Sequence, residues 1–393
     1  MAHNVVAFVG QNENRILEVV ARQFLDLLKP FGLPGHVINL HDPDWKQQLE
    51  PLIQEGILFA FGSAGIGAAL TLHDKNLWDA IQVPFISSLA DNPAQMPANH
   101  RINARFVVNG YHYREHFDVQ REIVRSAQIS TMLPHGVTPN PDCGKIPWSK
   151  RSHRIVFLKS GGDPEAKRAQ WAPWPGKLRE ILEESSKQAL LMPTGDVTPI
   201  VMGCVKSYGI EFSEKRDMLL AMLNEVDWYV RLVRLTMMAR ALCRVDADIF
   251  GARWEHIDQA GARARFHPAV DAALMHGLFA DTKYIVNVTP NFASGTHERV
   301  PNGFAAKACV VSDDNTYTLT KFHNLPSYFG FSWADPDWEA KLIDHLESHR
   351  TYDDELEPAF QIAHRDFNGL NFMQSMIQIA EVVRFGERLS GSH

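Results

Sequence analysis

Short runs of consecutive apolar residues, each followed by a helical repeat, recur along the chain. The first run covers residues 5–9 and is rich in β-branched residues, and apolar residues at helical spacing follow it over 16–28. A strand buried on both faces has such a continuous apolar run, and an amphipathic helix after it is typical of a doubly wound α/β fold. Runs over 37–40 and 56–61 predict two further strands. The chain therefore opens with a predicted Rossmann-like domain.

The same pattern starts again after a proline-rich segment. Prolines recur over residues 139–147, which predicts a linker. An apolar run over 154–158 then predicts the first strand of a second domain, and apolar residues three to four positions apart over 214–244 predict one or two long packed helices. At 393 residues the chain is long enough for two or three domains.

Residues 284–313 carry the most informative pattern in the chain. An apolar run is broken at 289–291, a Ser-Gly turn and His297-Glu298-Arg299 follow, and a second apolar run closes the stretch. This order predicts a strand, a loop, a short helix and a strand. Loops that leave the carboxyl ends of parallel strands line the ligand crevice of open α/β sheets. We interpret the stretch as a site for a phosphorylated, ribose-bearing ligand, with an exposed Glu298–Arg299 ion pair as the alternative.

The stretch also resembles a family signature. It is similar to the C-terminal motif of the glycosyltransferases related to the spore-maturation protein CgeB, in the wider GT-B group. The residues that carry the resemblance are Asn287, Pro290, Asn291, Gly295, Glu298, Arg299, Val300, Ala305 and Asp313. Segments 247–254 and 266–268 resemble the elements that precede this motif in the family, and segments 83–93 and 130–137 extend the resemblance into the first half.

The resemblance implies an α/β fold of GT-B architecture, with two Rossmann-like domains facing each other across a cleft. We expect an N-terminal acceptor domain at 1–140, a linker at 141–152 and a nucleotide-sugar donor domain with a helical insertion at 153–335. Helices over 336–393 would pack back on the N-terminal domain. Two positions depart from the family pattern: Asn302 replaces a Glu that holds the ribose, and Lys307 replaces a helix-ending Gly.

The donor diphosphate needs cationic or N–H partners. Lys159 follows the strand over 154–158, where the family commonly places a basic residue against the diphosphate, and the glycines beside it could form an anion nest. A solvated lysine at a strand end is the alternative. The predicted donor-binding residues are Lys159, Gly161, Asn291, Gly295, His297, Glu298, Arg299 and Asn302.

Transfer with inversion needs a general base for the acceptor hydroxyl, whereas transfer with retention does not. The N-terminal loops offer Asp91, His135, Glu13 and His112. We favour Asp91 because it follows an apolar strand at an expected cleft edge, although an Asp before Asn-Pro is also a common turn former.

Charge and composition exclude several classes of binding partner and site. A formal net charge of −7 argues against nucleic-acid binding, and no apolar run reaches the ~20 residues of a membrane span. The four cysteines form no C-x-x-C pair, which argues against a zinc ribbon or a disulfide framework and favours the cytoplasm. The oligomeric state stays open.

Two functions remain after these exclusions. The first is a glycosyltransferase, hexosyltransferase-like, that moves a sugar from a nucleotide-sugar to a glycan, a lipid-linked sugar or a protein. We predict no metal and no cofactor, because D-x-D occurs at three places without distinguishing any of them, and GT-B enzymes generally use cationic side chains on the diphosphate. The second is a non-catalytic two-lobed Rossmann protein that binds a nucleotide or another ligand.

Overall fold

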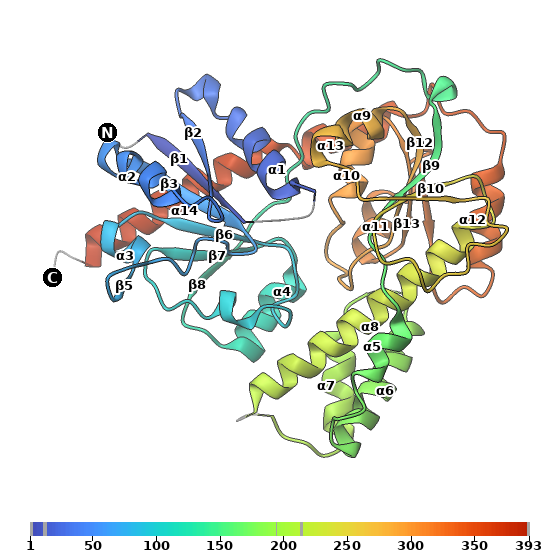
Figure 1. Cartoon of the computed structure of the whole chain (residues 1–393), viewed down its shortest axis with the longest axis horizontal. Helices are drawn as coiled ribbons and strands as arrows, with labels where there is room; N and C mark the ends of the chain where they lie inside the picture. The colour runs from blue at the N-terminus through green and yellow to red at the C-terminus, as the bar shows by residue number, and fades with distance from the viewer. Residues whose placement is uncertain (1–2, 11–13, 194, 213–214, 391–393) are drawn as a thin grey trace. The chain divides into compact units, whose positions relative to one another are not determined.

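The protein is described here by a computed structural model, which covers residues 3–10, 14–193, 195–212 and 215–390 (Figure 1). Over these residues the chain divides into two compact units. The first unit comprises the chain up to Thr138 together with the segment from Phe367 onward, and the second unit comprises Pro139–Asp366.

The first unit contains, over the described residues, a six-stranded sheet with the order β2-β1-β3-β6-β7-β8. Every pair of neighbours in it is parallel. The strands are β1 (Asn4–Val9), β2 (Gly35–Asn39), β3 (Ile57–Ser63), β6 (Phe85–Leu89), β7 (Val107–Tyr111) and β8 (Ile129–Met132). The helices are α1 (Ile16–Asp26), α2 (Trp45–Glu55), α3 (Leu77–Ile81), α4 (Arg114–Val119) and α14 (Gly369–Ser390), and β4 (Thr71–Leu72) pairs with β5 (Lys75–Asn76). The strands predicted at 5–9, 37–40 and 56–61 are confirmed.

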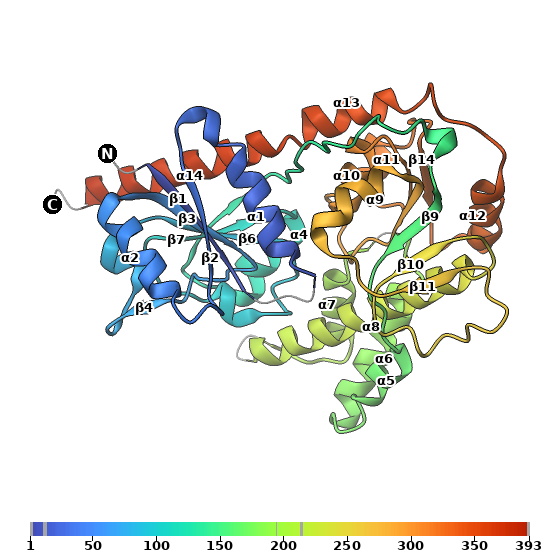
Figure 2. The ribbon, with the colours of Figure 1, turned by 45° about the horizontal axis from the view of Figure 1, so that its top comes forward.

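Alternation along β1 sends side chains to two cores. Val5 packs on one face with Phe24 of α1 and Phe372 of α14, whereas Phe8 packs on the other face with Trp78 of α3. Both faces of the sheet are thus covered, which explains why its strands have continuous apolar runs. Figure 2 shows α14 running along this sheet. Burying each of these large apolar side chains contributes roughly 1.5–3 kcal/mol.

The second unit contains, in its described part, another six-stranded sheet with the order β11-β10-β9-β12-β13-β14. All of its pairs are parallel. The strands are β9 (His153–Leu158), β10 (Asp248–Phe250), β11 (Arg265–His267), β12 (Thr282–Asn287), β13 (Cys309–Asp313) and β14 (Tyr328–Phe331). The helices beside the sheet are α9 (Met275–Ala280), α10 (Arg299–Ala305), α11 (Thr316–Lys321), α12 (Trp338–Glu347) and α13 (Glu357–Asp366). The predicted strand, loop, short helix and strand over 284–313 are confirmed.

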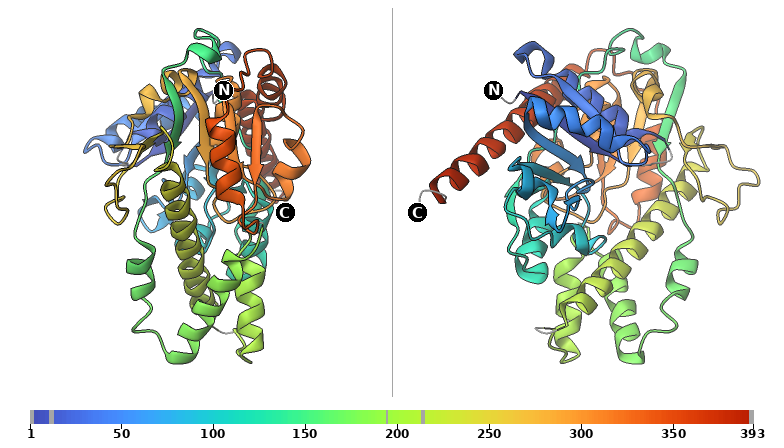
Figure 3. Two further views of the ribbon diagram at one scale, coloured as in Figure 1. Left: turned by 90° about the vertical axis from the view of Figure 1, so that its right-hand side faces the viewer. Right: turned by 60° about the vertical axis from the view of Figure 1, so that its left-hand side comes forward.

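A helical arm is inserted between β9 and β10 (Figure 3). It consists of α5 (Pro164–Ala169), α6 (Gly176–Leu190), α7 (Thr198–Ser207) and α8 (Arg216–Leu242). Apolar residues at three-to-four spacing along α8, such as Leu223 and Val230, are buried in the unit. The ion pair between Lys167 and Glu225, with Nζ and Oε2 2.7 Å apart, ties α5 to α8. The long helix predicted within 214–244 is confirmed.

The C-terminal segment is shared between the two units. Trp338 and Leu342 of α12 lie in the core of the second unit, and α13 packs on α10 of that unit. Phe372 and Met376 of α14 lie in the core of the first unit. The expected segment 336–393 therefore divides at about residue 366, because the apolar faces of its helices match different sheets. Among the helices that the structure describes, none has both the length and the apolarity needed to cross a membrane.

Candidate functional site

The strand order of the second unit reverses its direction between β9 and β12. From β9 the chain builds outward to β10 and β11, and it then returns to build β12, β13 and β14 on the other side. In open α/β sheets, ligands bind in the crevice at the carboxyl ends of the strands where the order reverses. Lys159 follows β9, and the loop of residues 288–298, which we call the donor loop, follows β12. The topology therefore places both predicted segments at the expected edge.

The turn after β9 is fixed by packing. The Trp254 Nε1 donates a hydrogen bond to the carbonyl oxygen of Lys159 at 3.1 Å, and a Cβ at Gly161 would lie 2.4 Å from the Trp254 ring. The Gly161 N–H donates to the Ala252 carbonyl at 2.8 Å. This N–H is thus used inside the protein and is not offered to an anion. In the structure, Gly161 therefore allows close packing against Trp254. Lys159 is partly buried and lies at the carboxyl edge of the sheet.

The donor loop is held by buried polar groups. The N–H of Thr289 donates to the Asp313 carboxylate at 2.7 Å, and the side-chain amide of Asn315 donates to the carbonyl oxygens of Phe292 and Gly295 at 3.2 and 2.9 Å. Burial raises the pKa of Asp313, and the hydrogen bonds from Trp333 and Thr289 and the charge of Arg234 act in the opposite direction. The loop therefore has a defined backbone path.

Asn291 is a structural residue of this loop. Its Nδ2 donates to the carbonyl oxygen and to the Oδ1 of Asp227, both at 2.9 Å, and its Oδ1 accepts a hydrogen bond from Arg234 at 3.2 Å. The side chain of Asn291 is only 3% exposed. The predicted contact between this side chain and the donor is at odds with these hydrogen bonds, because both ends of the amide are already used.

His297 and its neighbours create a positive site at the end of the donor loop. Burial, helped by the positive charges of Arg299 and Lys159, lowers the pKa of His297 to about 3, so the imidazole is neutral at pH 7. Its Nδ1 lies 2.9 Å from Oε2 of Glu298, which places the proton on Nδ1. A protonated Nδ1 cannot accept a hydrogen bond, so the Arg299 N–H, 3.3 Å from the same nitrogen, is only a close neighbour in this tautomer.

Arg299 and Glu298 have different partners among the contacts that the structure describes. Its guanidinium donates to the side-chain oxygen of Asn287 at 3.1 Å, whereas the exposed Glu298 contacts His297. The charges of Lys159 and Arg299 both act on the pKa of His297, so residues that follow β9 and β12 lie near one another. This site holds two cations, a neutral imidazole and the exposed carboxylate of Glu298, and its remaining positive charge suits a ligand with a negative charge.

Helix α10 begins at Arg299, four residues after Gly295. Before the helix, the carbonyl oxygen of Gly295 accepts the hydrogen bond from the Asn315 side chain. Asn302 lies in the first turn of α10, and its side-chain amide donates to the Glu298 carbonyl at 2.9 Å. Lys307 follows the helix with φ 53°, the left-handed conformation that the family's Gly would adopt.

A second group of polar side chains lies at the carboxyl edge of the first unit. The Oγ of Ser88 on β6 lies 2.8 Å from Nε2 of His112, and the hydroxyl of Tyr113 lies 3.0 Å from Nε2 of His135. The two imidazole rings stack with their centroids 4.6 Å apart. His135 is thus placed among groups that can exchange protons. Sequence reasoning named both histidines and Tyr113 but missed Ser88, which looks like an ordinary strand residue.

The other two predicted catalytic residues have different outcomes. Asp91 is exposed two residues after β6 and therefore lies at the same edge as the histidine pair. Glu13 lies outside the described residues.

Within the described ranges, no three His, Cys, Asp or Glu side chains converge in a way that could hold a metal ion. The expectation of a metal-independent site stays a prediction.

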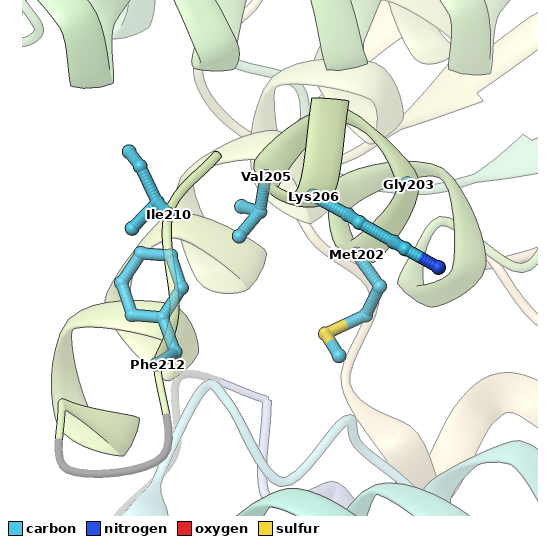
Figure 4. A pocket seen from close by; sticks show the side chains of 6 residues that line it. All are labelled: Met202, Gly203, Val205, Lys206, Ile210 and Phe212. Atoms are coloured by element: carbon cyan, nitrogen blue, oxygen red, sulfur yellow. The ribbon is translucent and has the colours of Figure 1, made fainter. Parts of the chain in front are cut away.

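An apolar pocket of about 280 Å³ lies on the helical arm (Figure 4). Met202, Val205, Ile210 and Phe212 supply most of its lining, with Lys206 as its single charged side chain among the lining residues. A nucleotide diphosphate needs several convergent polar groups. This pocket is therefore a poorer match to such a ligand than the edge that carries Lys159 and Arg299.

The two units, each with a doubly wound parallel sheet, define the GT-B class of fold. The chain matches no protein-family model and no curated protein, so the comparison rests on solved structures. An α-glucosyltransferase in complex with UDP-glucose and DNA containing an abasic site is similar with a TM-score of 0.53 and 9% identity, over 96% of this chain and 99% of that chain. AviGT4, a glycosyltransferase involved in avilamycin A biosynthesis, has a TM-score of 0.51 and 12% identity, over 97% and 98% of the two chains. These similarities confirm the predicted fold class.

Proposed function

We propose that the protein is a glycosyltransferase that uses a nucleotide-sugar donor. The observation that carries the proposal is the pair of cations, Lys159 and Arg299, beside neutral His297 at the point where the strand order reverses. A similar fold carries UDP-glucose in the α-glucosyltransferase described above, which supports a nucleotide-sugar as the ligand class. The finer assignment to the CgeB-related family, with a hexose donor and a cytoplasmic location, is part of the same proposal.

The chemistry follows from charge. When the glycosidic bond to the diphosphate breaks, negative charge grows on the departing oxygen, and fixed cations stabilise that charge in a water-poor site. We assign this role to Arg299 and Lys159, without a metal ion. The neutral His297 keeps an unprotonated Nε2 that can accept a hydrogen bond from a sugar hydroxyl.

The first unit would supply the acceptor side. His135 is the better candidate for a general base, because Tyr113 contacts its Nε2 and His112 stacks on its ring. Both contacts fix the orientation of the imidazole, and an oriented base transfers protons more efficiently. Asp91 remains a candidate from the same sheet edge, and it is the more exposed of the two.

A non-catalytic ligand-binding protein is the second candidate. The observation that favours it is Asn302, whose side-chain amide is turned back to the Glu298 carbonyl where the family's Glu would hold a ribose. Such a chain could bind an anionic ligand without transferring a sugar.

Calorimetric titration with UDP-, GDP-, dTDP- and CMP-sugars, together with an assay of donor hydrolysis, separates these functions. The proposal predicts binding of one nucleotide class in the micromolar to millimolar range and slow donor hydrolysis without an acceptor. Tight binding without hydrolysis or transfer to any acceptor would favour the second candidate. No binding at millimolar concentration would contradict the transferase.

A further inference from the structure

A buried arginine joins the helical arm to the donor loop. Arg234 of α8 is 2% exposed, and its guanidinium donates to Oδ1 of Asn291 at 3.2 Å. It also donates to the carbonyl oxygens of Ala189 and Met192 at 3.0 and 3.3 Å, at the end of α6. One side chain of α8 thus joins the end of α6 to the donor loop.

Asp227, two turns earlier on the same face of α8, completes this connection. Its carboxylate accepts from the Nδ2 of Asn291 at 2.9 Å, so Asp227 and Arg234 hold opposite ends of the same amide. The two residues are seven positions apart and therefore lie on one face of α8. Because an amide has one acceptor end and one donor end, this arrangement fixes its orientation as well as its position.

The arm also touches the donor loop through its backbone. A Cβ added at Gly195 would lie 3.1 Å from Cα of Asn291 and 3.2 Å from the amide nitrogen of Phe292. The segment between α6 and α7 therefore approaches the loop too closely for a larger residue to be placed there without a shift.

We infer that Arg234 is a positioning residue for the donor site. It acts through Asn291, whose side chain is used inside the protein, and it thereby sets the backbone path that leads to His297 and Arg299. This inference rests on the proposed function for the identity of the ligand. In this interpretation the inserted helical arm helps to position the donor loop. Apolar periodicity predicts that α8 packs in a core. It does not reveal what the buried charged residues of the helix contact.

The test compares two buried arginines of the second unit. Arg151 is 5% exposed and donates to the carbonyl oxygens of Thr282 and Ala306, and Thr282 starts β12 at the amino edge of the sheet. Arg151→Met therefore removes a comparable buried cation away from the donor loop. Both variants are expected to lower the melting temperature, since each leaves buried carbonyl oxygens without a donor.

UDP affinity, measured by calorimetry well below each melting temperature, separates the two variants. We expect Arg234→Met to weaken UDP binding by about tenfold, and Arg151→Met to leave it within about twofold of the wild type. Arg234→Lys should recover part of the affinity, because a lysine can still reach one of the partners. Unchanged affinity in Arg234→Met, or an equal loss in both variants, would overturn the inference.

A second readout does not depend on the proposed function. Amide hydrogen exchange over residues 289–299 should accelerate in Arg234→Met and not in Arg151→Met, whether or not the wild type binds UDP. If Arg234→Met does not fold, Gly195→Ala tests the inference instead, because it disturbs the close approach of Gly195 to Asn291. Amide hydrogen exchange over residues 289–299 should accelerate in this variant as well. Wild-type protein that binds no nucleotide would contradict the proposed function alone, whereas unchanged exchange would contradict the positioning role.

Discussion

At the scale of single residues, Arg299 is the side chain on which the proposed donor site depends most. Its guanidinium is partly exposed and donates a hydrogen bond to the side-chain oxygen of Asn287 at 3.1 Å, which holds it in place. Arg299→Ala should weaken binding or turnover of the donor by about 10²-fold, because a charge-assisted contact to the diphosphate is lost. The melting temperature should change little. Arg263→Ala, which removes an exposed arginine paired with Glu347, is the control. A large drop in melting temperature with unchanged donor binding would assign Arg299 to the fold.

His135 is the residue to test in the first unit. His135→Gln should reduce kcat by about 10²-fold or more and leave the donor Kd unchanged, because a general base acts on the acceptor in the transition state. The limb of the pH–rate profile that the base produces should disappear as well. The exposed His41→Gln serves as the control. An unchanged kcat would rule out His135 as the base and would fit a retaining reaction.

At the scale of elements, Asp248 links three strands of the second unit. Its carboxylate accepts from His153 on β9 and from Arg265 and His267 on β11. Burial alone would raise the pKa of Asp248, but these hydrogen bonds outweigh it and lower the pKa to about 2, from an ordinary value of 3.8. A carboxylate with a lowered pKa stabilises the fold fully above its ordinary pKa, and this contribution is lost as the pH falls toward 2.

Asp248→Asn should therefore lower the free energy of unfolding at pH 7 by at most about 2 kcal/mol. Screening by solvent makes the expected decrease smaller than this upper bound. The difference from the wild type should shrink below about pH 4. Urea titrations across this pH range measure it, with the more exposed Asp246→Asn as the control. A difference that stays constant down to pH 3 would mean that the ionised carboxylate is not what joins the strands.

Lys307 tests the end of α10. A residue with a positive φ is strained unless it is glycine, and Lys307 offsets this strain with a 2.8 Å ion pair to Glu357 and a position 4.7 Å from the centre of the Phe360 ring. Lys307→Gly and Lys307→Ala remove the same contacts, but only Gly relieves the backbone. We expect the Gly variant to be more stable than the Ala variant by about 1 kcal/mol in chemical denaturation. The reverse order, which is usual inside helices, would contradict this explanation.

At the scale of the whole molecule, the sequence predicts the layers better than the connections between them. Both parallel sheets follow from continuous apolar runs such as residues 5–9 and 154–158, because strands covered on both faces leave little room for polar residues. Lys159 could be singled out because it follows β9 directly, and Arg299 because it lies in the connection between β12 and β13; topology brings these connections to one sheet edge.

The polar connections could not be predicted in the same way. Arg234 and Asn291 are separated by 57 positions, and the polarity of a charged residue in a long helix gives no sign of a buried partner so far along the chain. For a similar reason the sequence did not predict that the C-terminal helices divide between the two units at about residue 366. Both α12 and α14 have an apolar face, and periodicity alone does not tell which sheet that face covers.

The central claim is that the edge formed by the β9 turn and the donor loop binds a nucleotide-sugar. Amide hydrogen exchange of the full chain, with and without saturating UDP-glucose and with the other nucleotide-sugars in parallel, tests it most directly. We predict slower exchange in residues 159–162 and 289–299 with one nucleotide class, and no such slowing when Arg299→Ala is used at the same ligand concentration. Protection confined to other segments, or no protection with any nucleotide-sugar, would contradict the claim.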